Sequence, residues 1–328
     1  MMAYIMGVDG GGSKTYTVIV NDSGKLLGHG ISGCGNYQMV GIDAAMQNIN
    51  SSINCALKQA NLAAEEIDFT MFGLAGADRE KDFSILRPAL GKLPLPRWDI
   101  VCDTFEGLRT GSPQNIGIVL VCGSGTNAAG KNRQGKTVQV GGFGYFFGDH
   151  AGGHEMAQST FRAAVRSWEG REIPSVLTQK VANYFGFNSM EEVFNYFLDH
   201  DIHHLPDGNL TLLLHEAANE GDRLAIRIIE ETGYELGIAA NSVIRRLGGF
   251  PGENFPVVLV GSVIQKGRNS YLLNSLHKTI AAENTNFEFV IPEMAPVYGA
   301  VLLAMDELGI KATDDMYKKF IDYGGYQV

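Results

Sequence analysis

The chain has 328 residues, of which 45 % are hydrophobic and 19 % charged, and its formal net charge is −10. This length predicts about two domains, and the balance of apolar and charged residues excludes a disordered chain or a coiled coil. The negative charge argues against nucleic acid or an anionic membrane as the main partner. Glycine is frequent: 41 of the 328 residues, or 12.5 %, are glycine, against an average of about 7 %. Its clusters are typical of tight turns.

Four cysteines, Cys34, Cys55, Cys102 and Cys122, form no C-x-x-C unit. We therefore expect free thiols in a reducing compartment. The sequence shows neither the features of a signal peptide nor the roughly 18 consecutive apolar residues of a membrane span. A soluble, cytoplasmic protein is expected.

The first part of the chain predicts strands at residues 4–8, 16–20 and 26–31, separated by turn-forming residues. Apolar residues recur every three or four positions from Ile42 to Ala60, which predicts one face of a helix. Two further apolar runs, 67–72 and 100–102, are typical of buried parallel strands. Strands that alternate with a helix indicate an α/β layer.

The second part begins with a similar pattern about a hundred residues later: strand 116–122, a glycine turn, a short segment to residue 130, a polar turn and strand 137–140. This weak repeat divides the chain near residues 113–116. Helices are expected at 154–168, 175–185, 190–198, 210–220, 222–247 and 296–308, and a buried strand at 256–260. We expect domains of residues 1–115 and 116–328, and keep open that the last helix packs back on the first domain.

The segment Asp9-Gly10-Gly11-Gly12-Ser13-Lys14-Thr15 follows the first strand. Consecutive glycines allow backbone N–H groups to converge on anionic oxygens, to which the Ser and Thr hydroxyls and the Lys charge add. Asp9 is a candidate for hydrated Mg²⁺, which prefers one or two carboxylates plus phosphate. The spacing is neither a Walker A loop nor a dinucleotide fingerprint, and an ordinary glycine-rich hairpin turn remains an alternative.

A second glycine turn, Gly123-Ser124-Gly125-Thr126, also follows a buried strand and precedes a hairpin. Alone it is typical of a plain turn. Two such loops from separate domains predict a nucleotide gripped from opposite sides. Gly261-Ser262, after a third buried strand, offers close backbone approach for the nucleoside.

Asp103 directly follows the strand at 100–102. An aspartate there is often only a cap or turn former, but ligands of α/β sheets bind beyond the carboxyl ends of strands. With phosphate loops present, Asp103 is a candidate base that accepts the proton of an attacking hydroxyl in phosphoryl transfer.

Residues 141–153 are the densest glycine segment, in which Gly142, Phe143 and Gly144 could form a wall for a small ring and Asp149 could accept hydrogen bonds from hydroxyls. The alternative is a bent loop, and we expect most of its aromatic residues, 143 and 145–147, in the core. Asn36 lies in another glycine-rich turn and is a candidate for a polar ligand. Asp199, His200, Asp201, His203 and His204 match no zinc spacing, so a solvated loop is expected there.

These motifs, with Ala295-Pro296-x-x-Gly299-Ala300, resemble the BadF/BadG/BcrA/BcrD ATPase family and, within it, N-acetylglucosamine kinases; the wider superfamily includes acetate and sugar kinases, Hsp70 and actin. The resemblance spans residues 7 to about 308. It implies two ribonuclease-H-like domains with a nucleotide cleft between them and a homodimer of a cytoplasmic kinase that uses ATP and Mg²⁺. A small sugar would be the substrate, with no nucleic acid or membrane partner.

The resemblance also implies roles for single residues. Asp103 would be the base on the sugar 6-hydroxyl, and Asp9 would hold Mg²⁺ through water. The ATP phosphates would contact residues 10–15 and 123–126, and adenosine would lie near Ala218, Gly261 and Ser262. The sugar would contact Asn36, Gly142, Phe143, Gly144, Asp149 and Asp103.

The chain departs from the family pattern after Asp149, where His150-Ala151-Gly152 replaces the usual Glu-Gly-Ser, and Phe143 replaces a frequent tryptophan. These changes leave the sugar open: N-acetylglucosamine, N-acetylmuramic acid, glucosamine or glucose. Two alternatives to a sugar kinase are an ATPase subunit that drives a partner enzyme and a non-enzymatic protein, either a nucleotide-gated binding module or a sugar sensor. Activators of the first kind hold an iron–sulfur cluster through a nearby cysteine pair, which this sequence lacks.

Overall fold

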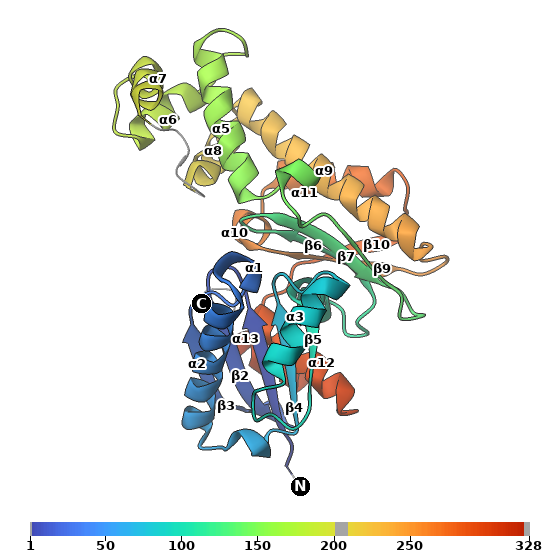
Figure 1. Cartoon of the computed structure of the whole chain (residues 1–328). Coiled ribbons are helices and arrows are strands. Elements are labelled where there is room, and N and C mark those ends of the chain that lie inside the picture. Colours follow the sequence, from blue (N-terminus) through green and yellow to red (C-terminus); the bar gives the residue numbers. More distant parts are fainter. Residues whose placement is uncertain (1, 201–208, 325–328) are drawn as a thin grey trace. The chain divides into compact units, whose positions relative to one another are not determined.

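A computed structural model describes residues 2–200 and 209–324 (Figure 1). Its chain divides into two compact units. Unit 1 comprises the described residues up to Gly117 and from Val290 onward, and unit 2 comprises those from Ile118 to Phe289. Each unit contains one five-stranded sheet with helices packed on it, so the expected α/β class is confirmed.

Unit 1 begins with three antiparallel strands. The first, β1, also pairs in parallel with β4, and β4 pairs in parallel with β5, giving the order β3-β2-β1-β4-β5. The strands are β1 (Tyr4–Gly10), β2 (Thr15–Asn21), β3 (Leu26–Ser32), β4 (Phe69–Leu74) and β5 (Trp98–Cys102). The helices are α1 (Tyr37–Val40), α2 (Ile42–Ala60), α3 (Glu80–Leu90), α4 (Asp103–Gly111), α12 (Pro296–Glu307) and α13 (Asp314–Asp322).

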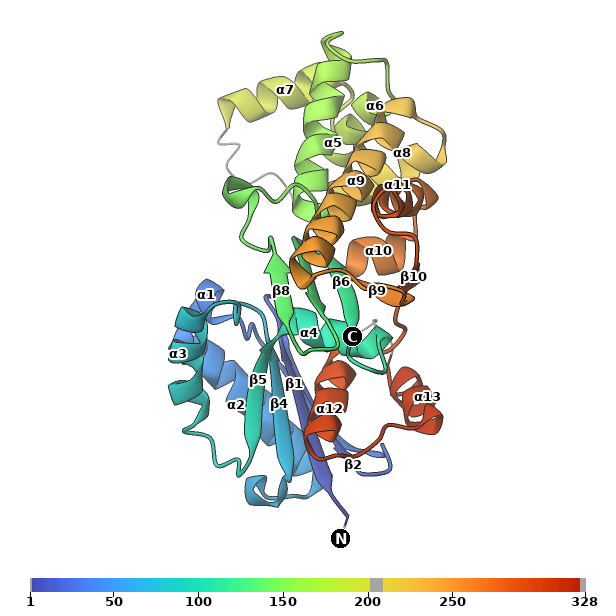
Figure 2. The same cartoon turned by 90° about the vertical axis from the view of Figure 1, so that its right-hand side faces the viewer.

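The two faces of the unit 1 sheet carry separate cores. On one face, α2 and α3 bury Ile49, Ile53 and Leu86 against sheet residues such as Phe72. The other face is covered by α12 and α13 (Figure 2). The sequence alone left open whether the helix at 296–308, here α12, packs on the first domain, and it did not predict α13. Nine of the twelve residues of α12 are buried, and Pro296 occupies its first turn, where no backbone N–H is needed.

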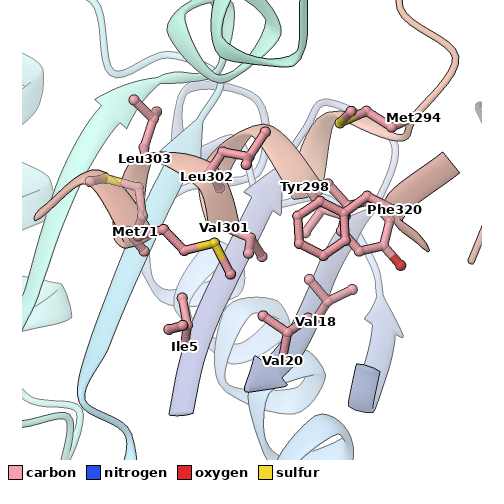
Figure 3. Packing of buried hydrophobic residues seen from close by; sticks show 14 of the residues in the cluster. Ile5, Val18, Val20, Met71, Met294, Tyr298, Val301, Leu302, Leu303 and Phe320 are labelled. Carbon is pink, nitrogen blue, oxygen red and sulfur yellow. The ribbon is translucent and has the colours of Figure 1, made fainter. Parts of the chain in front are cut away.

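Figure 3 shows this second core, in which Val301 and Leu302 of α12 lie over Ile5, Val18 and Met71 of the sheet. The rings of Tyr298 and Phe320 stack with centroids 4.9 Å apart and fix α13 against α12. The C-terminal segment is therefore part of the core of unit 1.

Unit 2 repeats the strand order of unit 1 with different sequences: β8-β7-β6-β9-β10. Its strands are β6 (Gly117–Cys122), β7 (Thr126–Lys131), β8 (Thr137–Val140), β9 (Phe255–Val260) and β10 (Phe287–Val290). Its helices are α5 (Gly153–Trp168), α6 (Leu177–Tyr184), α7 (Met190–Asp199), α8 (Asn209–Asn219), α9 (Arg223–Leu247), α10 (Ser262–Gly267) and α11 (Ser270–Ala281). The long α9 packs on β7, β8 and α11, whereas α5 to α8 pack on one another. Among the described residues, no helix is long and apolar enough to cross a membrane.

Candidate active site

Three carboxyl groups meet at one edge of the unit 1 sheet. Asp9 lies near the end of β1, and Asp103 follows β5 as the first residue of α4. Both strands run parallel with β4, so their carboxyl ends share this edge. Glu106 lies one helical turn beyond Asp103 and is only 1 % exposed. The structure thus brings the two predicted aspartates together with a third acid that the sequence analysis did not single out.

All three acids have raised pKa values, with burial as the largest cause in each case. Burial, followed by the charge of Asp103, raises the pKa of Asp9 to about 7, although the Lys14 charge opposes this. Burial, together with the nearby Asp78, raises the pKa of Asp103. Burial and both aspartates hold the pKa of Glu106 well above its usual range. Proton-binding groups with shifted pKa values are typical of catalytic sites.

Glu106 also affects Asp9, because their interaction lowers the pKa of Asp9 and raises that of Glu106. These directions fit a protonated Glu106 beside an ionised Asp9. Glu106 Oε2 has no hydrogen-bond partner among the described residues. A Cβ on Gly73 of β4 would lie 2.0 Å from Oε2, so Glu106 requires glycine at that position. The signal in the sequence was its spacing of three residues from Asp103, which places both on one helix face.

Asp103 is oriented by its neighbours. The Cys102 thiol donates to Asp103 Oδ1 at 3.3 Å, and the Thr104 hydroxyl donates to the same oxygen at 3.4 Å. The Cys102 thiol also lies 3.2 Å from Asp78 Oδ1. Burial raises the pKa of this thiol, so it stays protonated and remains a donor. Half-buried and held at one oxygen, Asp103 is suited to accept a proton.

The first glycine loop connects β1 to β2 beside these acids. Gly11 N–H donates to the Lys14 carbonyl at 2.9 Å, and Gly35 N–H donates to the Gly11 carbonyl at 3.0 Å, which fix the loop's shape. Gly12 and Ser13 are exposed, and no hydrogen bond within the described residues uses their N–H groups. Two such donors next to a lysine fit a phosphate.

The second glycine loop, in unit 2, is joined to the start of α5. Gly153 N–H donates to the Gly123 carbonyl at 2.8 Å, and His154 N–H donates to the Ser124 carbonyl at 3.0 Å. Ser124 and Gly125 are exposed. The loop presents backbone beside a helix N-terminus, which favours anions.

Gly261 brings the end of β9 against this second loop. Its φ is +99°, and a Cβ there would lie 2.4 Å from the carbonyl of Cys122. Only glycine fits both conditions. Ser262 is exposed at the start of α10, whereas Ala218 of α8 has 0 % exposure, so its own surface is closed to a ligand in this structure.

The residues expected at the sugar fall in both units. Asn36 of unit 1 caps α1 and accepts the N–H of Gln38 at 2.9 Å. Asp149 of unit 2 accepts the N–H groups of Gly142, at 3.1 and 3.2 Å, and Gly144, at 2.6 Å. Asp149 therefore shapes the loop that contains Phe143.

The expectation that most aromatic residues of this loop lie in the core was wrong. Phe143, Tyr145, Phe146 and Phe147 are 44, 64, 97 and 79 % exposed. The physical reason is the backbone: glycines at 141, 142, 144 and 148 have positive φ and surround one short 3₁₀ turn, which projects these rings instead of packing them.

Part of the histidine-rich segment, Asp201, His203 and His204, lies outside the described residues. The described residues contain no cluster of three or more His, Cys, Asp or Glu side chains that could hold a metal ion. A metal at Asp9 would therefore depend on other ligands, such as water and phosphate.

Residues 6–304 match the BadF/BadG/BcrA/BcrD ATPase family. The chain belongs to this family. It is 29 % identical over 312 residues to N-acetyl-D-glucosamine kinase of Dictyostelium discoideum, covering 92 % of this chain and 97 % of that protein. It is 26 % identical to N-acetylmuramic acid/N-acetylglucosamine kinase of Clostridium acetobutylicum, covering 93 % and 99 %.

Among solved structures, a candidate N-acetylglucosamine kinase from Chromobacterium violaceum has a fold similar to that of this chain. The TM-score is 0.69 and the identity 24 %, over 92 % of this chain and 99 % of the other. The fold expected from the sequence, two ribonuclease-H-like α/β units, is confirmed.

Proposed function

We propose that this chain is an ATP-dependent kinase that phosphorylates the 6-hydroxyl of N-acetylglucosamine or a related amino sugar. The similarity to two named amino-sugar kinases over at least nine-tenths of each chain supports this function. The observation that carries it is the juxtaposition, within unit 1, of Asp103 and the first glycine loop at the carboxyl edge of the sheet.

Asp103 serves as the base. Its carboxylate takes the proton of the sugar 6-hydroxyl while that oxygen forms a bond to the γ-phosphorus of ATP and the bond to the bridging oxygen of ADP breaks. A carboxylate with a raised pKa is a stronger proton acceptor than an ordinary aspartate. The donors on Oδ1 keep it oriented.

Residues of both units contact the nucleotide in this proposal. The segments 10–15 and 123–126 supply N–H groups to the phosphates, with the hydroxyls of Ser13 and Ser124. The hydroxyls of Thr15 and Thr126 instead donate to the carbonyls of Gly33 and Val121 and so hold the two loops. Gly261, Ser262 and the surroundings of Ala218 lie near adenosine. Mg²⁺, when bound, offsets phosphate charge; Asp9 is suited to hold it through water because this ion keeps most of its waters. Asn36, Gly142, Phe143, Gly144 and Asp149 contact the sugar.

ADP release in the presence of ATP, Mg²⁺ and one sugar at a time tests the function. The panel contains N-acetylglucosamine, N-acetylmuramic acid, glucosamine and glucose, and NMR of the product identifies the phosphorylated hydroxyl. At least one amino sugar is expected to stimulate release. Release that no sugar stimulates would refute the kinase and favour an ATPase that acts on a partner protein.

Asp103→Asn tests the base. Loss of general-base catalysis costs about 10²–10⁴ in kcat, while ATP binding, measured by calorimetry, is expected to stay within about threefold. Asp99→Asn on the same strand is the matched control, because Asp99 pairs with Arg87 on the exposed surface. An Asp103→Asn enzyme with unchanged turnover would remove Asp103 from this role.

A homodimer and a cytoplasmic location are further predictions for this kinase. Light scattering on the purified chain and fractionation of cells that express it are the measurements that check them.

A further inference from the structure

Asp82, in the first turn of α3, lies outside every motif discussed so far, yet its carboxylate accepts five hydrogen bonds. Its side chain has 0 % exposure. Arg79 donates to it three times: from the backbone N–H at 2.9 Å, from Nε at 2.9 Å and from Nη2 at 2.8 Å. These donors lower the pKa of Asp82, so it is a buried carboxylate with its charge compensated.

Two further donors reach Asp82 from α1, which is distant in sequence. The Tyr37 hydroxyl donates to Oδ1 at 2.5 Å, and Gln38 Nε2 lies 3.3 Å from the same oxygen. Gln38 Nε2 also donates to the Gly76 carbonyl at 3.1 Å. Tyr37 and Gln38 directly follow Asn36, so the buried carboxylate fixes the two residues that adjoin a proposed sugar contact.

These bonds determine how Asn36 is presented. Its Oδ1 is occupied by the N–H of Gln38, which orients the amide and leaves Nδ2 as the group that can donate. A helix of only four residues has little stability of its own, so α1 depends on contacts such as those with Asp82.

The segment that contains Asp82 also reaches the base. Asp78 lies four residues before Asp82, in the β4–α3 connection, and its Oδ1 lies 3.2 Å from the Cys102 sulfur. The same sulfur lies 3.3 Å from Asp103 Oδ1, so the single thiol proton is shared between the two carboxylates. One connection therefore touches both the Asn36 turn, through Asp82, and the residue that orients Asp103, through Asp78.

We propose that Asp82 is a positioning residue for the sugar: through Tyr37 and Gln38 it holds Asn36 so that its Nδ2 donates to a hydroxyl or carbonyl oxygen of the substrate at a fixed place relative to Asp103. The proposal rests on the proposed kinase function. Because Asp82 acts through Asn36, its loss weakens sugar binding and leaves the nucleotide loops unchanged.

Tyr37→Phe is the decisive variant, since it removes one hydroxyl and keeps the ring. Tyr4→Phe is its matched control, because Tyr4 packs against the same core and its hydroxyl makes no hydrogen bond within the described residues. Gln38→Met, at an exposed position, removes the second donor with no risk to the core. Hydrogen exchange of the protein without ligands and steady-state kinetics are measured for all four proteins.

For Tyr37→Phe and Gln38→Met we expect a sugar KM about tenfold higher, as for one lost hydrogen bond to a charged group, with the KM for ATP and kcat within about twofold. Exchange is expected to accelerate in residues 33–40 and to stay unchanged in β1 and β2. Tyr4→Phe should match the wild type in both measurements. An unchanged sugar KM, or equal effects in Tyr4→Phe, would overturn the positioning role.

The two proposals fail separately. If the wild type phosphorylates no sugar, the kinase function is refuted, and the hydrogen bonds of Asp82 then do not serve to position a sugar substrate. Wild-type kinase activity combined with unchanged exchange in residues 33–40 of both variants leaves the function intact and overturns the role of Asp82.

Discussion

Replacement of Asp9 by asparagine should make the ligand-free protein more stable, and increasingly so at higher pH. Asp9 has a pKa of about 7 in the folded chain instead of the usual 3.8, because of burial and the neighbouring Asp103. The folded state therefore binds more protons than the unfolded state between these pH values, and its stability falls as the pH rises through this window. Asparagine does not ionise, so its burial at this position adds no such pH-dependent cost.

The magnitude follows from the pKa. The difference between about 7 and 3.8, at about 1.4 kcal/mol per pH unit, sets an upper limit of about 4 kcal/mol at alkaline pH. Part of this loss of stability occurs below pH 5. Asp9 is also only half-buried, so solvent screening reduces the part that occurs above pH 5. We expect the advantage of Asp9→Asn over the wild type to grow by about 2 kcal/mol from pH 5 to pH 8.

Denaturant unfolding at several pH values, without nucleotide or divalent cations, is the assay. Asp322→Asn, at an exposed position in the last turn of α13, is the control and should show a constant difference from the wild type. The reasoning is refuted if the advantage of Asp9→Asn does not change with pH, or if this variant is less stable than the wild type at pH 8. The same variant should lose kinase activity, as expected for a residue whose strain serves function.

Two other substitutions test the packing around the acids. Gly73→Ala should lower the free energy of unfolding by about 2 kcal/mol, since its Cβ would lie 2.0 Å from the buried Glu106 carboxyl. The control is Gly125→Ala, whose Cβ meets nothing within 4 Å and which should leave the unfolding midpoint unchanged. Equal midpoints for the two variants would contradict the steric argument. Arg109→Met should cost about 2 kcal/mol because the buried guanidinium, 2 % exposed, pairs with Asp306 at 2.8 Å; thermal unfolding measures the loss, and a rise in Tm would show that apolar packing outweighs the pair.

The regular elements that bury one clear face could be predicted from the sequence. The period of three and four residues gave α2 its observed limits, Ile42–Ala60, and the apolar runs marked the central strands of both sheets. The similar strand order of the two units was visible only as a weak repeat, because it depends on chain geometry and not on shared residues.

Helices with weaker periodicity were not predicted. Pro88 lies inside α3, and a proline usually argues against a helix interior. In α13 only Met316 and Phe320 are buried, which is too short a pattern to identify within a polar tail.

The positions of Asp9 and Asp103 at one edge of the sheet could be predicted, because each ends an apolar run in the sequence. Glu106 could not be found in this way, because composition does not reveal that a helix turns a charged residue inward. The aromatic residues of segment 143–147 were misplaced since hydrophobicity was given more weight than the glycine backbone that carries them.

The division of unit 1 between the two ends of the chain has a consequence for its synthesis. On the ribosome, the first sheet emerges early, but the face that α12 covers stays uncovered until residues 296–307 are made. Unit 2 is continuous in sequence and is complete before then. Unit 2 can therefore complete its fold before unit 1, although the synthesis of unit 1 begins first. Until α12 is made, apolar residues of unit 1 such as Ile5 and Val18 lack the helix that buries them.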